Sequence, residues 1–204
     1  RGITPKITID LLRAGAAVVT TGDHIWDQKD ILGYIDTEPR LLRPINYPGQ
    51  TPGQGTVVLE TDKGKVGVIS VQGRTFMQPI LDNPFTALEQ AVVRMREETP
   101  VIVVDVHAET TSEKIAVGRF LDGRVSAVIG THTHVQTADE QIFPGGTAFL
   151  CDAGMCGPVE SILGREIEPI VGRFVTSMPA HFPVAKGPVG LHGALIEGDP
   201  ATGK

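Results

Sequence analysis

Two histidines separated by a single residue give this chain its clearest chemical signal. His132 and His134 lie in the segment 130–134, which directly follows the apolar run 125–129. We predict that this run is a buried strand, so both imidazoles enter the loop at its carboxyl end. Ligands bind at that edge of open α/β sheets, and neutral imidazole is a common metal ligand. The alternative is that both histidines only cap or hydrogen-bond the backbone.

The same arrangement occurs at two other points along the chain. Asp23 and His24 follow the apolar segment 16–21, and His107 ends the apolar run 101–107. Four of the six histidines are therefore expected at the ends of strands. Isolated core histidines would not be expected to share one structural position, so the sequence predicts a clustered metal centre.

Several other polar residues allow two interpretations each. Asp105 shares a strand face with His107, so it could orient an imidazole or satisfy a buried backbone group. His181 and His192 lie among prolines and glycines, where we predict structural or surface roles. Arg74 is a candidate phosphate contact, and a structural salt bridge is the equal alternative.

The order of elements predicts an α/β fold with a mixed sheet, because strands alternate with helices and β hairpins are inserted. Helices are expected at 5–14, 27–35, 84–95, 112–121 and 167–175. Strands are expected at 16–21, 56–61, 65–71, 101–107 and 125–129, with a hairpin at 142–150 and a terminal ribbon at 181–185 and 189–196. No linker divides the sequence, so we predict one domain over residues 1–204.

The composition narrows the classes of protein. With 204 residues, 41% hydrophobic content and 21% charged residues, the chain is long enough to bury a sizeable core. A net charge of −6 argues against binding to anionic membranes or stable binding to nucleic acid. No apolar run approaches the ~20 residues that span a bilayer, and no signal peptide is recognised, so a cytoplasmic location is expected. In that setting Cys151 and Cys156 are expected as free thiols.

Long blocks of the sequence carry a family resemblance. They are residues 1–4, 22–27, 72–77, 107–114, 121–128 and 130–140. In these blocks the chain resembles the calcineurin-like metallophosphoesterases, and more closely their YmdB-type bacterial branch, which hydrolyses cyclic nucleotide phosphodiesters. The resemblance implies a two-sheet α/β sandwich flanked by helices. It also implies a centre of two divalent metals, usually iron or manganese with zinc as an alternative.

The resemblance also implies roles for individual residues. His107 and His132 would bind one metal, His134 the other, and His24 would be the general acid that protonates the leaving alkoxide. Asp23 stands where the family usually has an asparagine ligand. A carboxylate is a competent ligand with an added negative charge, so we expect an altered metal preference or rate rather than loss of the site.

The family's first strand–helix–strand unit has no counterpart in the sequence. That unit carries an Asp ligand and a Glu-Asn pair whose Glu bridges the metals, whereas Arg1 begins where the family continues after it. We therefore expect the domain to be N-terminally incomplete. His134 alone would not hold a second metal, so the chain as it stands is expected to be inactive.

The predicted function is metal-dependent hydrolysis of small cyclic nucleotides of the 2′,3′-cAMP type. A non-catalytic nucleotide-binding or regulatory protein on the same scaffold is the alternative, and a mononuclear metallohydrolase such as an amidohydrolase is a third interpretation. The expected partner is a small phosphodiester, and assembly into a homo-oligomer is compatible with the sequence.

Overall fold

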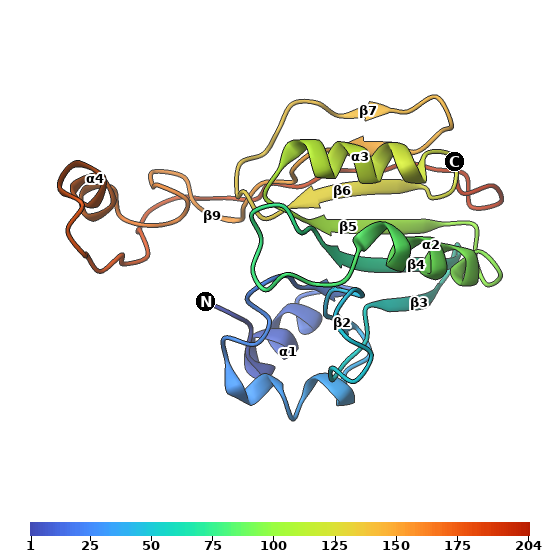
Figure 1. The fold of residues 1–204 in the computed structure, drawn as a ribbon, viewed down its shortest axis with the longest axis horizontal. Coiled ribbons are helices and arrows are strands. Elements are labelled where there is room, and N and C mark those ends of the chain that lie inside the picture. The colour runs from blue at the N-terminus through green and yellow to red at the C-terminus, as the bar shows by residue number, and fades with distance from the viewer.

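A mixed six-stranded sheet forms the centre of the computed structural model, which describes residues 1–204 (Figure 1). Its strand order is β3-β4-β5-β6-β8-β7. The strands are β3 (Thr56–Thr61), β4 (Gly64–Gln72), β5 (Ile102–His107), β6 (Ala127–Thr131), β7 (Gln141–Ile142) and β8 (Ala148–Leu150). Strands β4, β5, β6 and β8 are parallel, while β3 and β7 are antiparallel edge strands. The predicted α/β class with a mixed sheet is confirmed.

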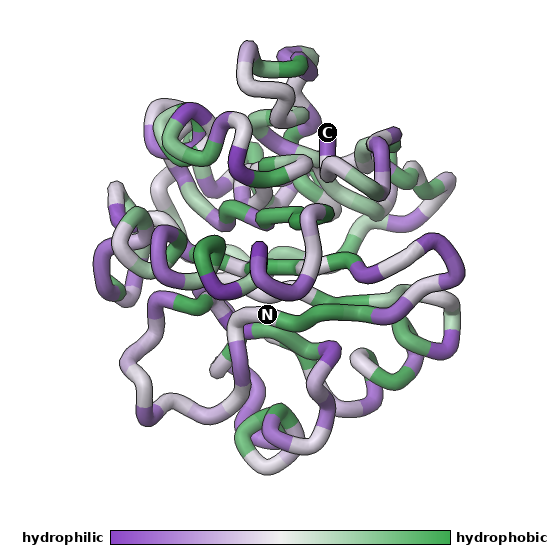
Figure 2. Tube along the Cα trace, turned by 90° about the vertical axis from the view of Figure 1, so that its right-hand side faces the viewer, coloured by the Kyte–Doolittle hydropathy of each residue, from purple (hydrophilic) through white to green (hydrophobic).

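Two helices connect the parallel strands and pack on one face of the sheet (Figure 1). Helix α2 (Pro84–Met95) leads from β4 to β5, and α3 (Thr111–Leu121) leads from β5 to β6. Burial alternates along β5, where Ile102, Val104 and Val106 are buried in the main core with residues of both helices. Asp105 and His107 therefore point to the opposite face, as the spacing predicts. Figure 2 shows the hydrophobic residues concentrated along these central strands.

Side-chain caps explain where two of the helices begin. The Thr4 hydroxyl accepts a hydrogen bond from the Ile7 backbone N–H at 3.3 Å, and the Asn83 side chain accepts one from the Phe85 N–H at 2.9 Å. A proline follows each cap at the first helical position, where its missing N–H costs nothing. Both helix starts agree with the prediction from the sequence.

The N-terminal region has a second, smaller core. It contains helix α1 (Pro5–Arg13), the strand pair β1 (Val19–Thr20) and β2 (Leu41–Leu42), and the short 3₁₀ helices η1 (Lys29–Ile31) and η2 (Ile35–Thr37). Its buried side chains are Ile25, Ile31, Ile35, Leu41, Tyr47 and Leu81. The region joins β4 through polar contacts, in which Ser70 Oγ donates to the Thr21 carbonyl at 3.1 Å. Beside the six-stranded sheet, β1 and β2 form a separate two-stranded parallel sheet.

A C-terminal arm, residues 157–190, projects beyond the carboxyl ends of β5 and β6 (Figure 1). It contains helix α4 (Ile167–Thr176) and is closed by β9 (Gly157–Pro158), which pairs antiparallel with β10 (Val189–Gly190). Isolated bridges join Arg165 to Ile162 and to Val184 inside the arm. None of the helices in the structure is long and apolar enough to cross a membrane.

Four predicted elements differ in the structure. The helix expected at 27–35 is wrong, because only the two 3₁₀ turns form on either side of Gly33. The strand expected at 16–21 is reduced to β1, since β2 offers it a partner only two residues long. The terminal ribbon is wrong in its pairing, because β10 pairs with β9 rather than with residues 181–185. Pro183 in that segment has no backbone N–H to donate to a partner strand. Strand β6 runs to Thr131, two residues beyond the predicted end.

Candidate metal centre

His107 and His132 meet because they lie at the ends of neighbouring parallel strands. In the β5–β6 register His107 is opposite Thr131, the last residue of β6, so His132 directly after it places its imidazole beside that of His107. His107 Nε2 lies 3.1 Å from His132 Nδ1. Gly22 permits the approach of the third segment, because a Cβ atom at that position would overlap the His107 ring.

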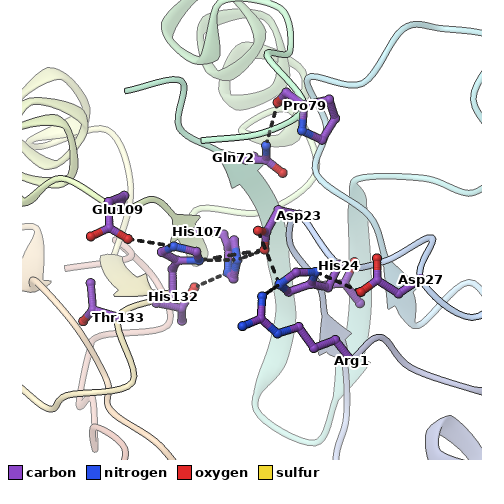
Figure 3. A network of polar contacts seen from close by, with 12 residues as sticks. Arg1, Asp23, His24, Asp27, Gln72, Pro79, His107, Glu109, His132 and Thr133 are labelled. Carbon is purple, nitrogen blue, oxygen red and sulfur yellow. Dashed lines mark hydrogen bonds and ion pairs between the residues drawn. The ribbon is translucent and has the colours of Figure 1, made fainter. Parts of the chain in front are cut away.

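Asp23 completes a cluster of three donor groups (Figure 3). Its Oδ1 lies 3.0 Å from His107 Nε2 and 3.8 Å from His132 Nδ1, and the three donor atoms all lie within 4.8 Å of one another. Bonds of ~2.0–2.2 Å from one metal to nitrogen and oxygen ligands place those ligands roughly 3–4 Å apart. The triad therefore fits one divalent metal, and its two nitrogens and one oxygen suit zinc, iron or manganese.

Hydrogen bonds behind the two imidazoles set which nitrogen faces the cluster. Thr131 Oγ1 donates its only proton to Asp105 Oδ1 at 2.8 Å, so it accepts from His107 Nδ1–H at 3.1 Å. On the other ring, His132 Nε2 donates to Glu109 Oε2 at 2.9 Å. Each neutral ring then directs a lone pair into the cluster. Asp105 thus takes the orienting role that the sequence allowed, acting through Thr131.

Ionisation in the cluster favours the metal-binding forms. Without a metal, a proton on His107 Nε2 hydrogen-bonds to Asp23 Oδ1 and holds the pKa of the Asp23 carboxyl below its ordinary value; a bound metal would take the place of that proton. Partial burial lowers the pKa of the His132 imidazole, and repulsion from the charge of the neighbouring His107 lowers it further. Both shifts extend the pH range in which these groups are deprotonated, which is the state that binds metal.

A buried ion pair holds the loop that carries His132 and His134. Lys114 Nζ lies 2.7 Å from Asp152 Oδ2, and each side chain is 1% exposed. The same oxygen accepts from Thr133 N at 3.0 Å and from Thr133 Oγ1 at 2.7 Å. The loop needs this support, because His132 and His134 have φ angles of 97° and 66°, in the left-handed region that non-glycine residues rarely adopt.

The sequence did not reveal this ion pair, since a lysine and an aspartate in isolation predict exposed positions. Burial alone would raise the pKa of Asp152, but hydrogen bonds from Lys114, Gly154 and Thr133 outweigh it and lower that pKa.

His24 lies beside the triad and faces the same space. Its Nδ1 is 3.0 Å from Asp27 Oδ2, and its Nε2 is 2.8 Å from Arg1 Nη1 and 3.6 Å from Asp23 Oδ2 (Figure 3). The Asp27 carboxylate orients the ring so that Nε2 is the nitrogen nearer the triad. Asp27 was not predicted, although its place three residues after His24 was a usable signal.

The triad and His24 line one wall of a cavity of about 1150 Å³. His134 also borders this cavity but is exposed and lies outside the triad. Arg74, His181 and His192 do not line it. Its lining residues are Arg1, Gly2, Asp23, His24, His107, Glu109, His132, Thr133, His134, Ile162, Leu163, Arg165, Ile170, Arg173, Phe174, Ser177 and Phe182. Cys151 and Cys156 are free thiols, as predicted.

Histidines and a carboxylate gathered at strand ends around a cavity are typical of metal-dependent hydrolases. Comparison with known proteins agrees. The YmdB-like protein family matches residues 1–204. The chain is 47% identical over 204 residues to a 2′,3′-cyclic-nucleotide 2′-phosphodiesterase of Bacillus subtilis (strain 168), covering 100% of this chain and 77% of that protein.

Two crystal structures share the fold. A hypothetical protein from Thermus thermophilus matches with a TM-score of 0.85 and 42% identity, over 93% of this chain and 73% of the other. A phosphatase from Mycoplasma pneumoniae matches with a TM-score of 0.82 and 36% identity, over 91% of this chain and 68% of the other. The chain therefore belongs to the YmdB-like family. The predicted family and the phosphoesterase class of enzyme are confirmed.

Proposed function

We propose that the protein is a metal-dependent phosphodiesterase that hydrolyses 2′,3′-cyclic nucleotides. The observation that carries the proposal is the position of His24 beside the triad of Asp23, His107 and His132 on one cavity wall. The relative in Bacillus subtilis, whose name describes this reaction, supports the choice of substrate. The comparisons favour an enzyme over the non-catalytic nucleotide-binding alternative.

The residues divide into ligands and an acid. Asp23, His107 and His132 would hold one divalent metal, and His134, on the same cavity, would contribute to a second site. Bound metals of this kind supply Lewis-acid activation of water and neutralise charge on the phosphate oxygens. Iron or manganese is the proposed metal. The Asp105–Thr131 relay keeps the His107 ring in the tautomer and orientation that ligation needs.

His24 supplies the proton that the reaction requires. The attacking water releases a proton to solvent as its oxygen bonds to phosphorus, the bond from phosphorus to O2′ breaks, and O2′ receives a proton from His24 Nε2 to give the nucleoside 3′-phosphate. For this step His24 is protonated on both ring nitrogens, so Arg1 Nη1 leaves its 2.8 Å contact with Nε2 when the substrate binds. Asp27 remains hydrogen-bonded to Nδ1 during the transfer and keeps Nε2 aimed into the cavity. General acid catalysis of this kind contributes roughly 10²–10⁴-fold in rate.

The test uses the purified full-length protein supplied with Mn²⁺ or Fe²⁺ and two substrates. We expect 2′,3′-cAMP to give 3′-AMP, and bis(p-nitrophenyl) phosphate to release p-nitrophenolate. His24→Asn should lower kcat for 2′,3′-cAMP by about 100-fold or more. The loss should be smaller for bis(p-nitrophenyl) phosphate, because its good leaving group needs less protonation. His192→Asn, which changes an exposed histidine outside the cavity, is the matched control. Absence of turnover with either substrate would refute the proposal.

A further inference from the structure

The C-terminal arm forms a cavity wall with a different chemistry from the wall that carries the triad. Both acidic lining residues, Asp23 and Glu109, belong to the triad side. The arm contributes two arginines and two phenylalanines with no carboxylate among them, namely Arg165, Arg173, Phe174 and Phe182. The arm thus presents cations and aromatic rings to the space in front of the metal ligands.

The two arginines are not neutralised by the protein. Arg165 Nη1 donates to the Phe182 carbonyl at 3.0 Å, and Arg173 Nη1 donates to the Ser177 carbonyl at 3.0 Å. Neither takes part in any ion pair of the structure. One nitrogen of each guanidinium therefore hydrogen-bonds within the arm. The group keeps its positive charge, and its other N–H groups remain available to a ligand. Phosphate oxygens are the ligands that this planar set of donors fits best.

The size of the cavity exceeds what a mononucleotide requires. Small-molecule sites usually measure roughly 300–1,000 Å³, and this one measures about 1150 Å³. Phe174 is 82% exposed on the arm, which leaves its ring available to stack on a base. The cavity therefore combines sufficient space with two arginines and an aromatic ring on the wall that the arm forms.

We propose that the arm binds the second phosphate and base of a short oligoribonucleotide whose 3′ end is a 2′,3′-cyclic phosphate. This inference rests on the proposed function, since the terminal cyclic phosphate occupies the triad side. Arg165 and Arg173 bind the neighbouring internal phosphodiester, and Phe174 stacks on the adjoining base. Water still opens only the terminal P–O2′ bond, O2′ takes the proton, and the internal phosphodiester stays intact. The net charge of −6 of the whole chain repels a longer polyanion and limits the preference to short chains.

Steady-state kinetics compare 2′,3′-cAMP with the adenylyl dinucleotide that ends in a 2′,3′-cyclic phosphate. We expect the wild-type KM to be about tenfold lower for the dinucleotide, equivalent to one good charged contact. Arg173→Gln, at an exposed position, should remove most of that advantage and change the KM for 2′,3′-cAMP less than twofold. Arg165→Gln should act likewise, with thermal unfolding reporting whether the arm's fold is retained. Arg13→Gln, an exposed arginine on α1, is the control.

A binding titration separates this inference from the proposed function. Calorimetry on the metal-loaded protein compares the two products, 3′-AMP and the dinucleotide 3′-phosphate. Tighter binding of the dinucleotide that is lost in Arg173→Gln supports the arm as a subsite even if neither cyclic substrate is turned over. Equal affinity for both products, or an equal loss for both in Arg173→Gln, overturns the inference whether or not the enzyme is active.

Discussion

Asp152→Asn should destabilise the protein strongly, because it leaves the Lys114 ammonium buried without its counter-charge. Both side chains are 1% exposed, and Asp152 Oδ2 accepts from Lys114 Nζ and from two groups of Thr133. An asparagine keeps one acceptor oxygen but places an NH₂ group among these donors. Removing one partner of a buried pair costs ~3–5 kcal/mol, which is a large share of the ~5–15 kcal/mol that stabilises a typical domain.

Urea unfolding measures this cost. With a slope of about 2 kcal/mol/M, a loss of ~4 kcal/mol moves the unfolding midpoint down by about 2 M. Asp10→Asn provides a matched control, because Asp10 pairs with Lys6 at 2.6 Å on the exposed face of α1, where the side chains are 54% and 84% exposed. An exposed pair of this kind contributes at most ~1 kcal/mol.

A double variant tests the assigned cause. In Lys114→Met/Asp152→Asn the unpaired charge is gone, so at least half of the lost stability should return. A loss below ~1 kcal/mol in Asp152→Asn would contradict the reasoning, since that is the size expected of an exposed pair. So would a double variant no more stable than Asp152→Asn, because the unpaired charge could then not be the cause.

Two more predictions concern the metal-binding cluster, and a third concerns the packing of the strand that leads to it. Thr131→Val removes the hydroxyl that fixes the His107 tautomer and should weaken metal affinity by about 10- to 100-fold. Competition with a metal chelator measures the affinity, and an unchanged value would contradict the orienting role of Asp105 and Thr131. The pKa of the His132 imidazole should lie below 6.5 in metal-free protein, because burial and the charge of His107 oppose its charged form. A pH titration followed by NMR of the ring protons measures this pKa, and a midpoint at or above 6.5 would contradict the reasoning. Gly130→Ala places a Cβ atom onto the Cys151 carbonyl oxygen, so the variant should be markedly less stable in thermal unfolding, and an unchanged Tm would show that the strands can separate.

Periodicity and capping predicted the parallel strands and the helices between them, because these elements follow from local sequence. His107 and His132 were placed together correctly on the same grounds, since neighbouring parallel strands end at one edge. The 3₁₀ turns near Gly33 were not predicted, because packing of Ile31 and Ile35 into the second core competes with the helical pattern. The support for the His-Thr-His loop was also missed, as it joins Lys114 to Asp152 across 38 positions of the chain.

Because the protein has two separate cores, its stability should depend on the supply of metal. Asp23 belongs to the N-terminal region, whereas His107 and His132 belong to the strands of the main core. A cation bound by all three therefore cross-links two independently packed parts of the chain. At a concentration 100 times its dissociation constant, such a cation adds ~2.7 kcal/mol against any opening that separates them. Resistance to proteolysis would then track metal supply, and scarcity of metal would shorten the lifetime of the protein as well as limit its chemistry.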